Sequence, residues 1–148
     1  MKTYSVFNVA NWFLEKAAMS PKKLQKLTYY AQAWAETLIN QNLIDDTVYE
    51  AWAHGPVSPE LYRKYKSYGW QDIDTHDESS IDDPKAIDLL DSVWLTYGDL
   101  SANELEALTH LETPWKNARH GLPDGAHCEN AISKEDMKNY YSQVYTGD

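Results

Sequence analysis

The chain has 148 residues, with 13 Lys and Arg against 23 Asp and Glu, so its formal net charge is −10. This length suits one domain, which we expect to span residues 1-148. So acidic a chain is a poor candidate for sequence-independent binding to DNA or RNA, because phosphate neutralisation supplies most of that affinity. The lone Cys128 excludes an internal disulfide framework and is typical of a reducing compartment. No apolar run has the length of a membrane span, and the first residues lack a signal-peptide pattern, so we expect a cytoplasmic protein with no membrane contact.

The charge is unevenly distributed along the chain. Residues 1–70 hold eight Lys and Arg and six Asp and Glu, a net of +2, whereas residues 71–148 hold five and seventeen, a net of −12. The acidic part is suited to steering a basic protein partner. Two interpretations of the basic residues near the N-terminus stay open, a local site for an anionic partner and a solvated helix face. These residues are Lys22, Lys23, Lys26, Arg63, Lys64 and Lys66.

Helix starts are marked by a capping side chain placed before a proline, whose missing N–H has no partner at the first helical position anyway. Later in the chain, Ser101 and Glu104 form a predicted capping box, and Ser133 precedes acidic residues suited to the start of a last helix. Gly69 and Gly98 stand where helices are expected to stop. The four predicted starts with proline are Ser20-Pro21, Ser58-Pro59, Asp83-Pro84 and Thr113-Pro114.

Apolar residues recur at helical spacing between these signals and predict the core-facing stripes. Residues 47–53 are rich in β-branched and aromatic side chains and predict a short strand, with Ile73 as its expected neighbour. Residues 72–83 are predicted to be a loop. We therefore expect an all-α (mainly α) domain of six or seven helices, with at most a minor β element near 47–53. The predicted stripes are Val6, Val9, Ala10, Phe13, Leu14, Ala17; Leu24, Leu27, Ala31, Trp34, Leu38; Ile87, Leu90, Val93, Trp94, Tyr97; Leu105, Leu108, Leu111; and Met137, Tyr140, Tyr141, Val144.

Short motifs follow one another in a particular order along the chain. They are Lys23-Leu24-Gln25-Lys26-Leu27, Tyr29-Tyr30, Ala51-Trp52, Gly55-Pro56-Val57, Tyr62, Leu108-Thr109-His110, Pro114-Trp115 and Ile132-Ser133. In order and spacing they resemble the Panacea domain, a family of phage-associated proteins that includes the SocA-type antitoxins. The resemblance covers nearly the whole chain, although the acidic stretch from Gln71 to Asp83 departs from the family pattern.

The resemblance implies an antitoxin, borne on a phage or prophage, that neutralises a cognate toxin by direct protein–protein binding. A variant of this hypothesis makes the domain a proteolysis adaptor that delivers its toxin to a cellular protease. We expect partner-binding or family-motif roles for residues in the predicted helix after Ser20-Pro21, in the segment from Trp52 to Tyr62, and at one downstream tryptophan. They are Lys22, Gln25, Lys26, Tyr29, Tyr30, Trp52, His54, Gly55, Pro56, Tyr62 and Trp115.

Patterns for metal binding and catalysis fit less well. A calcium loop starting at Asp72 has Asp77 where a glycine is required and Asp83 where a glutamate is required. The candidate zinc ligands His110, His120, His127 and Cys128 match no common spacing.

No Gly-x-Ser-x-Gly elbow or Gly-rich phosphate loop is present. We therefore predict no catalytic residues, metal or cofactor, and we expect His54 to bond a turn backbone. Two rival hypotheses remain: an enzyme whose site lies around His54 with Lys22, Lys26 and Tyr29, and a virus-encoded modulator of a host protein.

Overall fold

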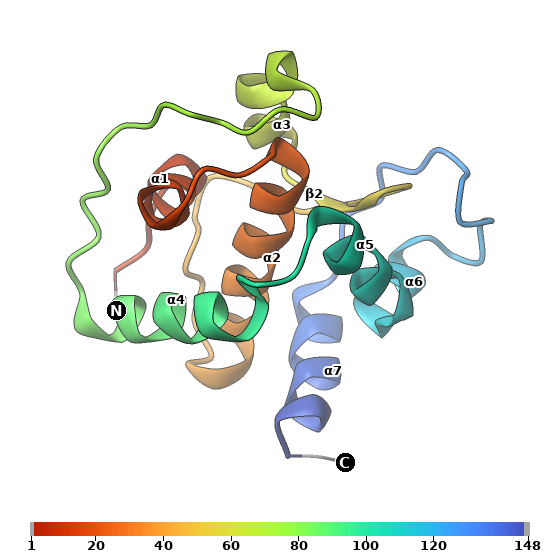
Figure 1. The fold of residues 1–148 in the computed structure, drawn as a ribbon. Helices are drawn as coiled ribbons and strands as arrows, with labels where there is room; N and C mark the ends of the chain where they lie inside the picture. The colour runs from red at the N-terminus through yellow and green to blue at the C-terminus, as the bar shows by residue number, and fades with distance from the viewer. Residues whose placement is uncertain (1, 147–148) are drawn as a thin grey trace.

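Seven α-helices and one β-hairpin make up the fold in the computed structural model, which describes residues 2–146 (Figure 1). The predicted mainly α fold with a minor β element is confirmed. No helix in this described range has the length and apolar character needed to cross a membrane. In chain order the elements are α1 (Val6–Lys16), α2 (Pro21–Leu38), β1 (Glu50–Trp52), β2 (Gly55–Val57), α3 (Pro59–Tyr65), the 3-10 turn η1 (Lys66–Tyr68), α4 (Pro84–Tyr97), α5 (Ala102–Leu111), α6 (Thr113–Ala118) and α7 (Lys134–Thr146).

Most helices start where the capping signals predict. The side chains of Ser20, Ser58 and Asp83 each accept a hydrogen bond from a backbone N–H in the first turn of α2, α3 and α4. Ser101 and Glu104 form both bonds of the predicted capping box at α5. These bonds satisfy N–H groups that have no partner inside the helix.

The start of α6 differs from the prediction. Thr113 is the first residue of the helix rather than its cap, and Glu112 takes the cap position without a side-chain bond to the helix. The Glu112 carboxylate instead points into the core, where its Oε1 accepts hydrogen bonds from the hydroxyls of Tyr30 (2.8 Å) and Tyr141 (2.7 Å). The Glu112 carboxylate therefore bonds two tyrosines in the core and does not cap α6.

Helix α2 runs through the middle of the fold, with α1, α3, α4, α5, α7 and β2 packed around it (Figure 1). Every residue from Leu24 to Ala33 is buried. A helix enclosed on all sides buries its polar residues together with its apolar stripe, so Gln25 and Lys26 are buried as well. A solvated helix face is consequently the wrong interpretation for Lys26.

Four predicted core positions lie outside the core. Leu38, at the end of α2, and Ala17, just after α1, are exposed. Leu111 and Val144, near the ends of α5 and α7, are also exposed. On α5 the buried face runs through Leu105 and Thr109 instead, because this helix turns toward α2 and β2.

The predicted strand is confirmed, but its partner is not Ile73. Strands β1 and β2 pair antiparallel, with Trp52 opposite Gly55 across the turn. Ile73 instead forms an isolated bridge to Met19, donating its N–H to the Met19 carbonyl at 2.8 Å. Pairing with a strand two residues away closes a much shorter loop than pairing with a distant segment, and so costs less chain entropy. This explains the local hairpin.

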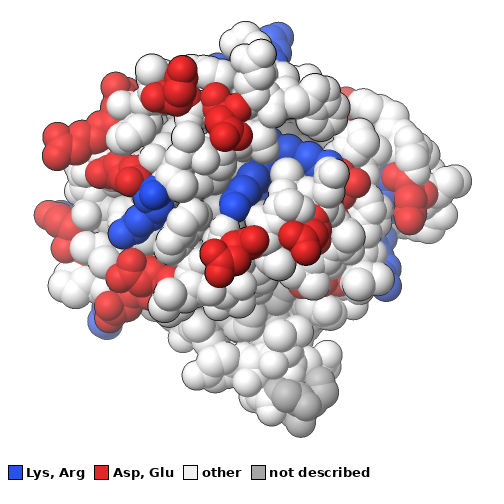
Figure 2. Space-filling view, viewed as in Figure 1, with Lys and Arg blue, Asp and Glu red and all other residues white. Residues whose placement is uncertain are grey.

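The predicted acidic loop at 72–83 is confirmed as a loop, and it passes around the outside of α1 on its way to α4 (Figure 1). It is attached by the Asn8 side chain, which bonds Ser79 and Ser80, and by the buried Ile73 and Ile81. Figure 2 shows acidic side chains spread over the face in view, with Lys and Arg side chains among them near its centre. The sequence asymmetry thus does not divide this face into an acidic side and a basic side.

Candidate functional site

A pocket of about 330 Å³ lies where α2, the hairpin, α3 and the segment after η1 meet. We call it the lysine–aromatic pocket, because lysines and large aromatic rings make up much of its lining. Six of the eleven predicted site residues line it. The full lining is Pro21, Lys22, Gln25, Lys26, Trp52, His54, Val57, Leu61, Tyr62, Tyr65, Lys66, Gly69 and Trp70.

Lys26 is the most unusual residue of the pocket. Its side chain is only 1% exposed, and its ammonium donates one hydrogen bond, at 3.3 Å, to the Pro56 carbonyl. Burial first, and then the nearby positive charge of Lys22, lower its pKa from 10.5 to about 7, against a smaller opposite effect of Glu106. A lysine ammonium has three donors, so much of its bonding capacity is unused.

Gly55 gives the Lys26 side chain its space. The φ of Gly55 is +107°, a conformation that side-chain-bearing residues rarely adopt. A Cβ at this position would lie 2.7 Å from Lys26 Cε and 3.0 Å from Thr109 Oγ1. The Gly-Pro motif therefore lets the hairpin backbone pass directly against the lysine.

A second lysine of the pocket is neutralised by an acid. Lys22 Nζ lies 2.7 Å from Glu106 Oε1 and also donates to Asn103 Oδ1 at 2.8 Å. The same Glu106 oxygen lies 3.0 Å from His54 Nδ1, so the expected bond between His54 and a turn backbone gives way to a contact with α5. Burial acts to raise the pKa of Glu106, but the hydrogen bond and charge of Lys22 outweigh it and hold that pKa below its usual value.

Gln25 has a positioning role. Its side-chain amide donates to the Ser58 carbonyl at 3.0 Å and its oxygen accepts from the Ser58 N–H at 2.8 Å. This two-bond clamp holds the N-terminus of α3 against α2. The amide is therefore occupied within the protein, although Gln25 lines the pocket.

Aromatic rings form the outer part of the pocket. Trp52 and Tyr62 meet edge to face, with their ring centroids 5.0 Å apart. Trp70 is 81% exposed and Tyr62 is 44% exposed. Lys22 Nζ lies 6.0 Å from the Trp70 ring centroid. Exposed tryptophan and tyrosine beside a cavity are the residue types that most often anchor protein interfaces.

The other predicted site residues lie outside the pocket. Tyr29 and Tyr30 are buried in the core, where the Tyr29 hydroxyl pairs with that of Tyr141 at 3.1 Å. Trp115 lies behind the hairpin and donates its Nε1–H to the Trp52 carbonyl at 2.8 Å. Pro56 contributes the carbonyl that holds Lys26. The enzyme hypothesis built on His54, Lys22, Lys26 and Tyr29 thus loses Tyr29 from its cluster.

Several contributors to the pocket were not predicted as site residues from the sequence. Glu106 holds Lys22 and His54, yet it looks like any surface acid of a helix. Lys66 was noted only as part of the basic cluster, and Trp70 was not singled out. A tryptophan directly after a helix-ending glycine in a polar stretch was the available signal for Trp70.

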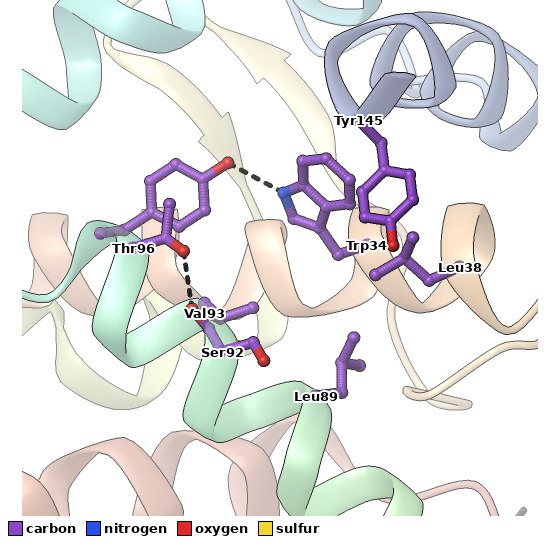
Figure 3. A pocket seen from close by; sticks show the side chains of 8 residues that line it. Trp34, Leu38, Leu89, Ser92, Val93, Thr96 and Tyr145 are labelled. Atoms are coloured by element: carbon purple, nitrogen blue, oxygen red, sulfur yellow. Dashed lines mark hydrogen bonds between the residues drawn. The ribbon is translucent and has the colours of Figure 1, made fainter. Parts of the chain in front are cut away.

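A second hollow, of about 300 Å³, lies between α2, α4 and α7 (Figure 3). In its wall the Trp34 indole N–H donates a hydrogen bond to the Tyr97 hydroxyl, at 2.8 Å. No charged side chain and none of the predicted site residues line it, which makes it the weaker candidate. Its lining is Trp34, Leu38, Leu89, Ser92, Val93, Thr96, Tyr97 and Tyr145.

Within residues 2–146, no cluster of three or more His, Cys, Asp and Glu side chains is arranged to hold a metal ion. Of the candidate zinc ligands, Cys128 is buried, whereas His120 is exposed.

The fold and the pocket define a mainly α-helical domain with a pocket lined by lysines and aromatic rings. The chain belongs to the SocA-like antitoxin family with the Panacea domain, whose model matches residues 24–116. It is 31% identical to Antitoxin SocA of Caulobacter vibrioides (strain NA1000 / CB15N), in an alignment covering 76% of this chain and 69% of that protein. No solved structure matches the chain. The predicted family is confirmed.

Proposed function

We propose that this chain is the antitoxin of a toxin–antitoxin pair and neutralises its cognate toxin by direct binding rather than by catalysis. Family membership supports the antitoxin role. The observation that carries the binding mode is the lysine–aromatic pocket with its exposed Trp70 and Tyr62. We further propose that the pair is borne on a phage or prophage and acts in the cytoplasm, with residues 1-148 acting as one unit.

Trp70 is proposed to be an anchor of the toxin interface. Interface tryptophans often cost 2 kcal/mol or more when truncated, which corresponds to about thirtyfold weaker binding. Because Trp70 is 81% exposed, Trp70→Ala leaves the core intact. Leu95 on α4 is 82% exposed and does not line the pocket, so Leu95→Ala is a matched control.

The test is co-expression with the toxic product of the adjacent gene. We expect wild type and Leu95→Ala to rescue growth and to co-purify with the toxin, and Trp70→Ala to do neither. Growth rescue without any complex would contradict direct neutralisation and favour delivery of the toxin to a cellular protease. Normal toxin binding by Trp70→Ala would show that the toxin interface lies outside this pocket.

A further inference from the structure

We propose that the lysine–aromatic pocket receives a carboxylate side chain of the toxin, which pairs with the Lys26 ammonium while Trp52, Tyr62 and Trp70 cover the pair. This inference rests on the proposed function and adds the chemistry of the partner. It assigns to an acidic residue of the toxin the role of an anchor in the pocket.

The first observation is a buried cation without an anion. Lys26 is 1% exposed, and no ion pair joins it to an acid in the described part of the chain, although Lys22 beside it is paired with Glu106 at 2.7 Å. A buried charge is costly unless it is paired. An arriving carboxylate would supply the missing charge and accept the donors that the Pro56 carbonyl leaves free.

The second observation is the balance of charge and donors around the pocket. Lys22, Lys26 and Lys66 line it, and Glu106 compensates one of these three cations. The lining favours a carboxylate over a phosphate, because Pro21 at the start of α2 and Pro56 beside Lys26 have no N–H to offer. The charged donors available to a ligand are therefore side-chain ammonium groups rather than a backbone cradle.

The third observation is the aromatic cover. Trp52 and Tyr62 already contact each other edge to face, and Trp70 stands exposed at the mouth. When a protein surface packs on these rings, water leaves the pocket, and a charge pair inside it gains strength from the lower local dielectric. The pocket thus combines a cationic interior with an apolar rim suited to an acidic residue flanked by apolar ones.

Proton uptake follows from this geometry. With a Lys26 pKa of about 7, only about a tenth of the side chains are charged near pH 8, so pairing with a carboxylate draws in about 0.9 proton per complex. Affinity then falls up to about tenfold for each pH unit above 7. The other ionisable groups facing Lys26 are Lys22 on its own helix, Glu106 and His110 on α5, and His54, Tyr62, Tyr65 and Lys66 around the pocket.

The experiment is calorimetric titration of the chain with the toxin near pH 8, in two buffers of different ionisation enthalpy. Wild type should take up about 0.9 proton. Lys26→Met should lose this uptake and bind at least about thirtyfold more weakly. Lys23→Met is the matched control, because Lys23 lies on the same helix but outside the pocket and donates to the Gly98 carbonyl. It should behave as wild type.

Further variants separate the possible outcomes. His54→Gln removes the exposed histidine at the pocket and should leave the uptake unchanged. If Lys26→Met does not fold, Lys26→Gln replaces it, and unchanged affinity in that variant overturns the inference. Unchanged affinity and uptake in Lys26→Met overturn it too, while the proposed antitoxin function stands. A toxin that does not bind the wild-type chain overturns the proposed function, and the inference with it.

Discussion

Replacing Gly55 with alanine tests the contact between the hairpin and Lys26. The φ of +107° makes any Cβ unfavourable, at a cost of about 1–3 kcal/mol for such backbone strain. The new Cβ would also lie 2.7 Å from Lys26 Cε, and overpacking of this kind costs about 1–3 kcal/mol more. We therefore expect Gly55→Ala to destabilise the fold by about 2–6 kcal/mol, which corresponds to roughly 5–20 °C in Tm.

Gly121 provides the matched control. Its φ is +82°, but nothing lies within 4 Å of a Cβ built there. Gly121→Ala thus carries only the backbone cost, and we expect it to lower the Tm by about 3–6 °C. Thermal and urea unfolding of both variants measure the difference.

A double-mutant cycle isolates the part due to Lys26. Lys26→Ala removes Cε, so Gly55→Ala should cost about 1–3 kcal/mol less in that background than in wild type. Additive costs, together with equal losses for Gly55→Ala and Gly121→Ala, would refute the idea that the glycine exists to accommodate the lysine. A Gly55→Ala variant that melts normally yet fails to bind the toxin would instead place the turn in the recognition surface.

Three more predictions concern ionisable groups. The folded-state pKa of Lys26, about 7, lies below its ordinary 10.5, so this group makes stability rise with pH between those values. Lys26→Met should remove that rise and increase the free energy of unfolding at pH 7, as measured by urea unfolding near pH 7 and 9. Burial raises the pKa of Glu112 from 4.5 to about 7 despite its bonds from Tyr141 and Tyr30, so its contribution to stability falls as pH rises through that window; Glu112→Gln should flatten the difference in unfolding free energy between about pH 5 and 7.5. Reversing four exposed loop acids to lysine should slow association with a basic surface of the toxin and weaken its salt dependence, with little change in dissociation; unchanged on-rates across a salt series would mean that the acidity serves solubility alone. These acids are Asp72, Asp74, Asp77 and Glu78.

Local chemistry made much of the fold predictable. A cap such as Ser20 or Ser58 satisfies N–H groups two or three residues away, so its effect needs no knowledge of distant segments. The capping box at Ser101 and the glycine that ends α4 also act over a few residues of chain, so they too could be predicted locally. The order of short motifs likewise indicated the family, because it lies in the sequence itself.

The site depended on contacts that no local pattern contains. Lys26 looks like a surface lysine in the sequence, and it is buried because α2 is enclosed by helices and by the hairpin that Gly55 brings against it. Tyr29 looks like a neighbour of that site, but the helix turn directs its ring to Tyr141 in the core. Glu106 reaches Lys22 across two helices. Capping is decided over three or four residues of chain, whereas burial and charge pairing are decided by which distant segments pack together, and only the tertiary structure specifies that.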